Sequence, residues 1–109
     1  MTTLVIHAPT WRHRAESVKS FQQTVDSGVG EGYALARTEL ELLRPGCRVI
    51  VLDKGSKQRA DARLIRLEPT GVWAGNGVQR YNIHLDQVRC VTYGESQSIR
   101  LNHRGIAII

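Results

Sequence analysis

The sequence predicts an α+β protein that is mostly β, with six to eight short strands arranged as a small barrel or a strongly bent sheet. Three observations predict this class. Short apolar segments rich in β-branched residues recur along the chain, glycine-rich turns separate them, and one stretch alone shows the helical spacing of apolar residues. We therefore expect one amphipathic helix and one short helical turn beside the strands.

A chain of 109 residues suffices for one modest core, so we expect residues 1–109 to form a single domain. The N-terminus shows no signal-peptide pattern, and no apolar run is long enough to span a bilayer. These features predict a cytoplasmic protein without membrane association. Cys47 and Cys90 are far apart in the sequence, and both are expected to be small core residues in a reducing compartment.

The first expected element is a strand over residues 2–8, which is rich in β-branched residues and is stopped by Pro9. Trp11 follows in the connection, with Arg12 and Arg14 beside it. An aromatic ring next to arginines can stack on a base while the arginines bind its phosphates. A tryptophan in such a position more often covers the end of a core, and the sequence leaves both interpretations open.

Residues 16–26 predict the amphipathic helix, because Val18, Phe21 and Val25 recur at helical spacing. Gly28 is placed to end this helix. The glycines at 28, 30 and 32 follow a helix and precede a strand, which reverses the order of a dinucleotide-binding fingerprint. We therefore expect a flexible connection there and no dinucleotide site.

Residues 32–36 predict a short strand, and Thr38 with Glu41 matches a capping box that opens a single turn of helix. The sequence Arg44-Pro45-Gly46 then predicts a tight turn, in which proline fixes φ and glycine accepts a positive φ.

Residues 43–67 predict a central hairpin, with a buried strand at 49–52, a polar loop at 53–59 and a returning strand. This hairpin carries the excess charge of the chain. The basic residues between 44 and 66 are Arg44, Arg48, Lys54, Lys57, Arg59, Arg63 and Arg66, and the acidic ones are Asp53 and Asp61. Seven positive and two negative charges give +5, which equals the formal net charge of the whole chain. A localised positive excess is typical of phosphate binding, although charged residues also protect a solvated hairpin with an edge strand.

The C-terminal half predicts further short strands separated by turns. Residues 69–71 and 75–77 are turn sequences around a brief apolar segment, and Gly75-Asn76-Gly77 is the strongest hairpin signal in the chain. The expected elements are strands at 81–85 and 88–93 with a turn at 86–87, a polar loop at 94–98, and a closing hairpin of 99–101 with 106–109 across a turn at 102–105.

No catalytic or metal-binding pattern stands out. The four histidines, at positions 7, 13, 84 and 103, show no ligand spacing, so we expect neither a metal nor a cofactor. His84 and Cys90 could be a base and a nucleophile, but nothing in the sequence would orient the base. The sequence favours a non-enzymatic role and leaves an enzyme acting on a nucleotide or a nucleic acid as an alternative.

The order of these parts resembles the PUA-like superfamily, and within it the small EVE-type domains. The resemblance covers the layout of residues 3–93: a first strand running into residues 7–11, a helix, a helical turn ending in residues 43–46, and the strand at 49–52. Cys47 stands where these domains usually carry an aspartate. The resemblance implies a pseudo-barrel with helices at its rim, and members commonly bind RNA or DNA, some holding a modified base in an aromatic-lined pocket.

By position, the resemblance places Trp11 and the region of Tyr33 along the cleft between barrel and helix, with Trp73 as a further candidate. Taken with the basic hairpin, it predicts a nucleic-acid-binding module, with RNA favoured over DNA. The candidate binding residues are Trp11, Arg12, Arg14, Tyr33, Lys54, Lys57, Arg59, Arg63 and Trp73. The main alternative is a protein-interaction or self-association module that pairs through the apolar C-terminal strand at 106–109.

Overall fold

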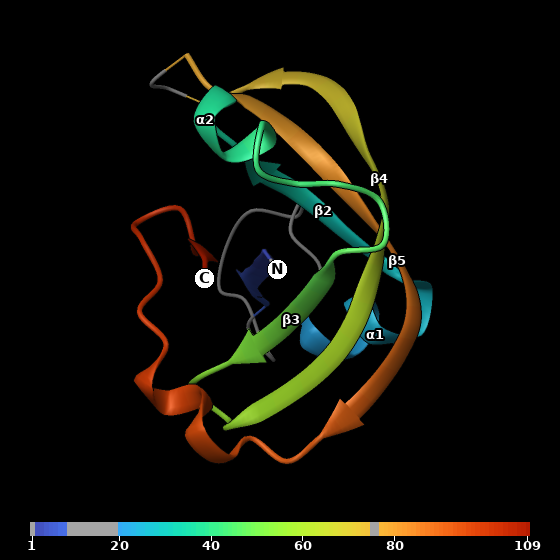
Figure 1. Cartoon of the computed structure of the whole chain (residues 1–109), viewed down its shortest axis with the longest axis vertical. Helices are drawn as coiled ribbons and strands as arrows, with labels where there is room; N and C mark the ends of the chain where they lie inside the picture. The colour runs from blue at the N-terminus through green and yellow to red at the C-terminus, as the bar shows by residue number, and fades with distance from the viewer. Residues whose placement is uncertain (1, 9–19, 75–76) are drawn as a thin grey trace.

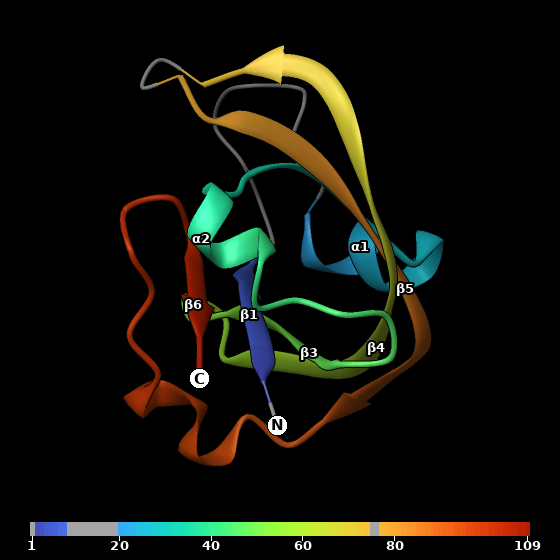
Figure 2. The same ribbon diagram turned by 45° about the horizontal axis from the view of Figure 1, so that its top comes forward.

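Six strands form one curled sheet in the computed structural model, which describes residues 2–8, 20–74 and 77–109 (Figures 1 and 2). The strands are β1 (Thr3–His7), β2 (Val29–Ala34), β3 (Arg48–Asp53), β4 (Gln58–Trp73), β5 (Gln79–Val91) and β6 (Ile106–Ile108). The helices are α1 (Phe21–Ser27), α2 (Arg37–Leu40) and the 3₁₀ helix η1 (Gly94–Ser98). The prediction of a mostly β, α+β fold is confirmed.

The sheet has the strand order β2-β5-β4-β3-β1-β6. β1 pairs in parallel with β3, and the other neighbours are antiparallel. Within the described residues no strand pairing joins β2 to β6, so the sheet is a curled half-barrel with these two strands at its edges (Figure 2).

The main core lies on the inner face of this sheet. Its central residues are Leu4, Ile6, Val49, Val51, Leu64 and Ile83, with Phe21 added from α1. The alternate residues Val5, Ile50 and Leu52 point to the outer face, because side chains along a strand alternate between faces. The C-terminal segment covers this second cluster with Tyr93, Ile99, Leu101 and Ala107.

Helix α1 begins at Phe21 rather than at residue 16. Ser20 has an extended backbone and caps the helix, since its hydroxyl accepts a hydrogen bond from the Gln23 N–H at 3.3 Å. The predicted start and Val18 lie outside the described residues. Gly28 ends the helix as predicted, and its N–H donates to the carbonyl of Thr24.

Gly30 and Gly32 belong to β2, so the flexible connection predicted for them is wrong. A Cβ atom at Gly30 would lie 3.0 Å from the ring of Tyr33, and glycine therefore lets that ring pack over the strand. The cap of α2 also differs from the prediction. Glu39, and not Glu41, accepts a hydrogen bond from the Ala36 N–H at 2.7 Å, because the helix begins two residues before the expected capping box would place it.

The tight turn before β3 is confirmed. The Cys47 N–H donates to the carbonyl of Arg44 at 3.1 Å, and Gly46 has a φ of 88°, which fits a turn that requires positive φ after proline.

β4 and β5 are long strands, so the breaks predicted at 69–71 and 86–87 are wrong. Pro69 and Gly71 lie inside β4, where the register with β5 shifts. Proline is tolerated there because this part of β4 has no strand on its other side in the described sheet. Gln87 has a positive φ of 53° inside β5 and forms a bulge instead of a turn.

The C-terminal part of the chain forms less β structure than expected. β6 pairs with β1, while residues 99–101 are irregular and residues 94–98 form the 3₁₀ helix. The turn at 102–105 is confirmed by the Gly105 N–H, which donates to the carbonyl of Asn102 at 2.9 Å. Cys47 is buried as predicted, but Cys90 is exposed because the core ends before it along β5.

Candidate functional site

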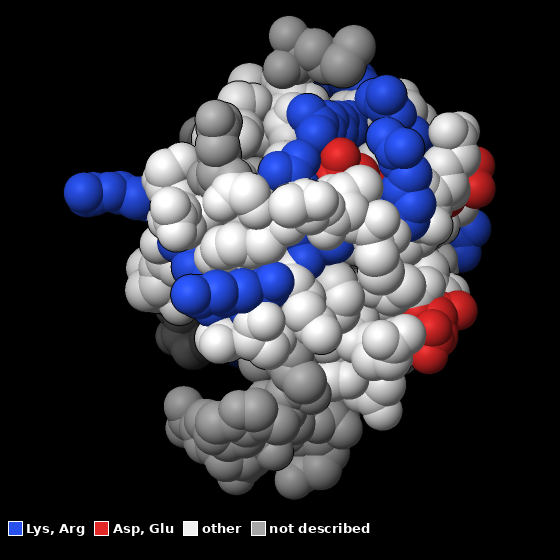
Figure 3. Space-filling view, turned by 90° about the horizontal axis from the view of Figure 1, so that it is seen from below, with Lys and Arg blue, Asp and Glu red and all other residues white. Residues whose placement is uncertain are grey.

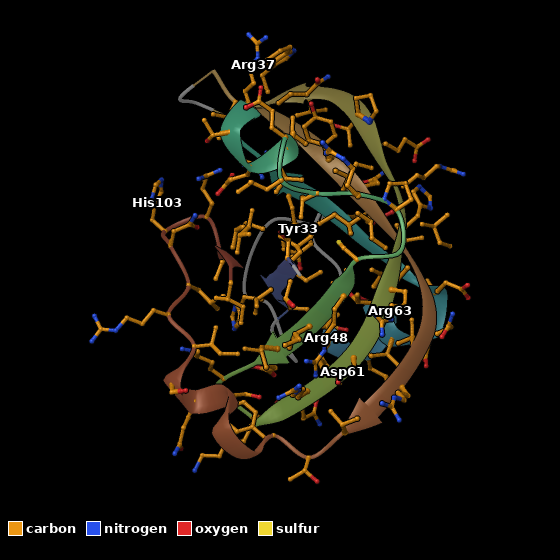
Figure 4. All side chains as sticks on the ribbon, viewed as in Figure 1. Tyr33, Arg37, Arg48, Asp61, Arg63 and His103 are labelled. Carbon is orange, nitrogen blue, oxygen red and sulfur yellow. The ribbon has the colours of Figure 1, made fainter. Side chains whose placement is uncertain are left out.

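Four arginines surround one aspartate on the outer face of β3, β4 and β5. The strand register places Arg48 opposite Arg63, and Asp61 opposite both Ile50 and Arg89. Arg59 and Arg63 flank Asp61 at alternate positions of β4, so all three point to the same side of the sheet. We call Arg48, Arg59, Arg63 and Arg89, with Asp61, the arginine face. Figure 4 shows Arg48, Asp61 and Arg63 lying together on β3 and β4.

Asp61 holds two of these arginines in place. Its carboxylate accepts from Arg48 Nη2 at 2.8 Å and from Arg59 Nε at 2.9 Å. Arg59 also donates to the hydroxyl of Ser96 in η1 at 3.0 Å. Burial raises the pKa of Asp61, but the hydrogen bonds and charges of Arg59 and Arg48 outweigh it, so the pKa of Asp61 lies below its ordinary value. Asp61 is therefore ionised at neutral pH.

The other two arginines of the face are unpaired. Arg63 and Arg89 are exposed, and neither makes a hydrogen bond or an ion pair within the described part of the chain. Four arginines and one aspartate leave a charge of +3 on this surface. Figure 3 shows basic side chains gathered around a small acidic spot on this side of the molecule.

The predicted lysines have other surroundings. Lys54 Nζ donates to the carbonyl of Ile99, which ties it to the C-terminal segment. Lys57 is exposed in the turn between β3 and β4, with a φ of 56°. This turn is ordered by buried Asp53, which accepts from the Gly55 N–H at 3.0 Å and the Ser56 hydroxyl at 2.5 Å. The loop predicted at 53–59 is thus shorter, and Arg59 lies in β4.

The two predicted aromatic residues that the structure describes do not join the arginine face. Tyr33 is buried, with 6% exposure, and its hydroxyl donates to the carbonyl of His7 at 2.7 Å. Trp73 is 61% exposed, but it lies at the other end of β4 from Arg59. Trp11, Arg12 and Arg14 lie outside the described residues. Neither Tyr33 nor Trp73 therefore combines with these arginines as the resemblance predicted.

The imagined pair of His84 and Cys90 is not a catalytic pair. The residues are six positions apart along β5, which corresponds to at most about 20 Å in an extended strand, and the bulge at Gln87 lies between them. His84 Nε2 instead lies 2.8 Å from the carboxylate of Glu68 on β4, and this hydrogen bond lowers the pKa of Glu68. Among residues 2–8, 20–74 and 77–109, no group of three potential metal ligands is present.

The edge strand β6 has few free backbone groups. The Ile106 N–H donates to the side chain of Asn102 at 3.1 Å, and the Ile106 carbonyl accepts from the Asn102 N–H at 2.8 Å. Ile109 follows the strand and is exposed. The backbone edge open to another chain is therefore short.

The sequence prediction included Arg59 and Arg63 but omitted Arg48, Asp61 and Arg89 from the site. The alternation of Arg59, Asp61 and Arg63 could have placed these three on one face, because side chains two apart in a strand point the same way. Arg89 could not be found in that way, since its place beside Asp61 depends on the bulge at Gln87.

No helix in the described part of the chain is long and apolar enough to cross a membrane. In comparisons with known proteins, no family model matches the chain, and neither a curated protein nor a solved structure matches it.

Proposed function

We propose that this chain is a non-enzymatic nucleic-acid-binding module that binds the phosphate backbone through the arginine face. One observation carries the proposal: Arg63 and Arg89 have no carboxylate partner within the described residues. They lie beside Arg48 and Arg59, which Asp61 holds in place. Localised cations without carboxylate partners are the groups that phosphates bind.

Arginine suits this role because its planar set of donors binds a phosphate with two hydrogen bonds and stays charged at physiological pH. Arg48 and Arg63 are direct cross-strand partners, so their side chains leave the sheet about 5 Å apart. Two arginine side chains that leave the sheet this close together can share one phosphate or contact two successive ones. Asp61 pairs with Arg48 at 2.8 Å and partly neutralises its charge, so within the described residues Arg63 and Arg89 are the arginines of the face that are free to bind a phosphate.

At the arginine face, the proposed binding depends on charge and not on stacking by Tyr33 or Trp73. Tyr33 is buried and Trp73 lies at the far end of β4, so neither of these two predicted residues can stack on a base held at the arginine face. Contacts to phosphates fix position but carry little sequence information. We therefore expect weak dependence on sequence for the binding energy that the arginines supply.

The resemblance to PUA-like, EVE-type domains supports the preference for RNA over DNA. The structure follows the predicted order of first strand, helix, short helix, Pro-Gly turn and buried strand, and under this proposal the curled sheet is a PUA-like pseudo-barrel. A cytoplasmic location belongs to the same proposal, and the free thiols of Cys47 and Cys90 suit a reducing compartment.

A second candidate is self-association through β6, because this strand lies at the edge of the sheet and is followed by exposed Ile109. The bonds between Ile106 and Asn102 oppose this role, since they occupy backbone groups that a second chain would need. Light scattering tests the self-association candidate. A protein that stays monomeric at high concentration would rule it out.

The proposed function is tested by a binding screen of short single- and double-stranded RNA and DNA at low and moderate salt. We expect RNA to bind most tightly, and we expect affinity to fall as salt rises, because binding releases counterions from the phosphates. Absence of binding to every nucleic acid, or affinity that does not change with salt, would remove the proposal.

A further inference from the structure

We propose that a pocket at the start of β1 and β3 receives the base of a nucleotide whose phosphate lies on Arg48 and Arg63. The inference rests on the function proposed above and names a subsite for it. The pocket has a volume of about 330 Å³. It is lined by Thr2, Leu42, Arg44, Pro45, Gly46 and Cys47. This volume lies at the lower end of the range for small-molecule sites and suits a ligand no larger than a nucleotide.

The pocket adjoins the arginine face through the backbone. Cys47 lines the pocket, and the residue that follows it is Arg48. Thr2 also lines the pocket, and the residue that follows it, Thr3, pairs with Arg48 between β1 and β3. Side chains alternate along a strand, so the pocket and the arginines lie on opposite sides of the same strand ends. A nucleotide that bends around these ends places its base on one side and its phosphate on the other.

The lining has the chemistry of a base site. Leu42, Pro45 and Cys47 supply apolar contact for a flat ring. The guanidinium of Arg44 is held by its Nη1, which donates to the carbonyls of Glu41 and Leu43 at 2.9 Å each. A fixed guanidinium plane is a good stacking surface for a base.

The pocket is preformed. The Gly46 N–H donates to the carbonyl of Leu64 at 2.7 Å, and the Leu64 N–H donates to the carbonyl of Cys47 at 2.9 Å. These bonds fix the turn against β4, so a ligand need not order it on binding. The side chain of Thr2 makes no hydrogen bond within the described residues, and its hydroxyl is available to a polar edge of the base.

The two cysteines of the chain allow a direct test. In a Cys90→Ser variant, Cys47 is the single thiol and reports on the pocket; in a Cys47→Ser variant, exposed Cys90 is the matched control. We expect adenosine 5′-monophosphate and short single-stranded RNA to slow alkylation of Cys47 by N-ethylmaleimide at least threefold. Inorganic phosphate is expected to leave the Cys47 rate unchanged, and adenosine 5′-monophosphate is expected to leave the Cys90 rate unchanged. RNA is not used with the Cys90 control, because Cys90 follows Arg89 of the arginine face.

Amide chemical shifts give a second readout that does not require alkylation. We expect adenosine 5′-monophosphate to shift the amides of Gly46, Cys47 and Arg48, and inorganic phosphate to shift Arg48 without shifting Gly46. RNA binding without protection of Cys47 and without a shift at Gly46 overturns the pocket and leaves the nucleic-acid function standing. If adenosine 5′-monophosphate slows alkylation of Cys47 but the protein binds no RNA, the pocket is supported and the proposed nucleic-acid-binding function is overturned.

Discussion

Arg104 and Glu39 join the two ends of the curled sheet. Arg104, in the turn before β6, forms two hydrogen bonds to the carboxylate of Glu39 in α2, at 2.6 and 3.0 Å. The same guanidinium donates to the carbonyl of Ala34 at the end of β2, at 3.0 Å. Since β2 and β6 are the edge strands, this mostly buried ion pair links edges that the backbone does not pair.

Replacing Arg104 with alanine is therefore expected to destabilise the fold by about 2 kcal/mol, because hydrogen bonds to charged groups contribute roughly 1.5–3 kcal/mol and Glu39 would lose its partner. Arg100→Ala is the matched control: this arginine is exposed and has no partner within the described residues. Urea unfolding measures both. A loss at Arg104 no larger than at Arg100 would show that the link contributes nothing.

Tyr33→Phe is expected to lower stability by about 1 kcal/mol, since one buried hydrogen bond to the His7 carbonyl is lost and the ring remains. The affinity for RNA is expected to stay unchanged, because Tyr33 lies in the core. Loss of RNA binding in a folded Tyr33→Phe protein would show that the Tyr33 hydroxyl takes part in RNA binding, as the sequence predicted.

Stability is expected to fall as the pH drops below about 6.5, through His7. Burial lowers the pKa of His7 in the folded protein, with a smaller contribution from Lys54 and an opposing one from Asp53. The unfolded chain then takes up the proton first, so acid favours unfolding and the stabilisation is complete only above the unfolded pKa.

Urea midpoints at pH 7.5, 6.0 and 5.0 test this expectation. His7→Gln is expected to flatten the decline, whereas His103→Gln, at an exposed turn position, is expected to leave it intact. Equal declines in wild type and His7→Gln would assign the acid sensitivity to other groups.

Asp61→Asn is expected to strengthen RNA binding and to steepen its salt dependence. The change removes the one carboxylate of the arginine face and releases Arg48 and Arg59 from their ion pairs. Each arginine that gains a phosphate adds roughly −0.7 to the slope of log K against log salt on single strands. Fluorescence anisotropy at several salt concentrations measures the slope, and weaker binding by a folded Asp61→Asn protein would mean that Asp61 chiefly positions the arginines.

Local signals predicted several elements correctly. The β-branched run at 49–52 forms β3 because its residues are apolar on both faces, and β3 is in fact buried on both. The turn at Pro45-Gly46 was predictable because both residues fix their own backbone angles.

Other features depend on contacts distant in the sequence. Pro69 and Gln87 suggest breaks locally, but pairing between β4 and β5 absorbs both as irregularities within long strands. The charge count predicted a basic hairpin, yet only the register shows that Arg48 and Arg59 share one carboxylate while Arg63 remains free. The sequence alone could not show that Arg89, on β5, lies beside Asp61 and belongs to the arginine face.

The most direct measurement is the salt dependence of RNA binding by the wild type and by an Arg63→Ala, Arg89→Ala double variant. If three or four phosphates are neutralised, the wild-type slope of log K against log salt is roughly −2 to −3, and losing two arginines reduces its magnitude by roughly 1.4. An Arg37→Ala, Arg100→Ala double variant loses the same charge at exposed positions outside the arginine face, and Figure 4 shows Arg37 far from Arg48. We expect this control to keep the wild-type slope, and equal slopes in all three proteins would contradict the account.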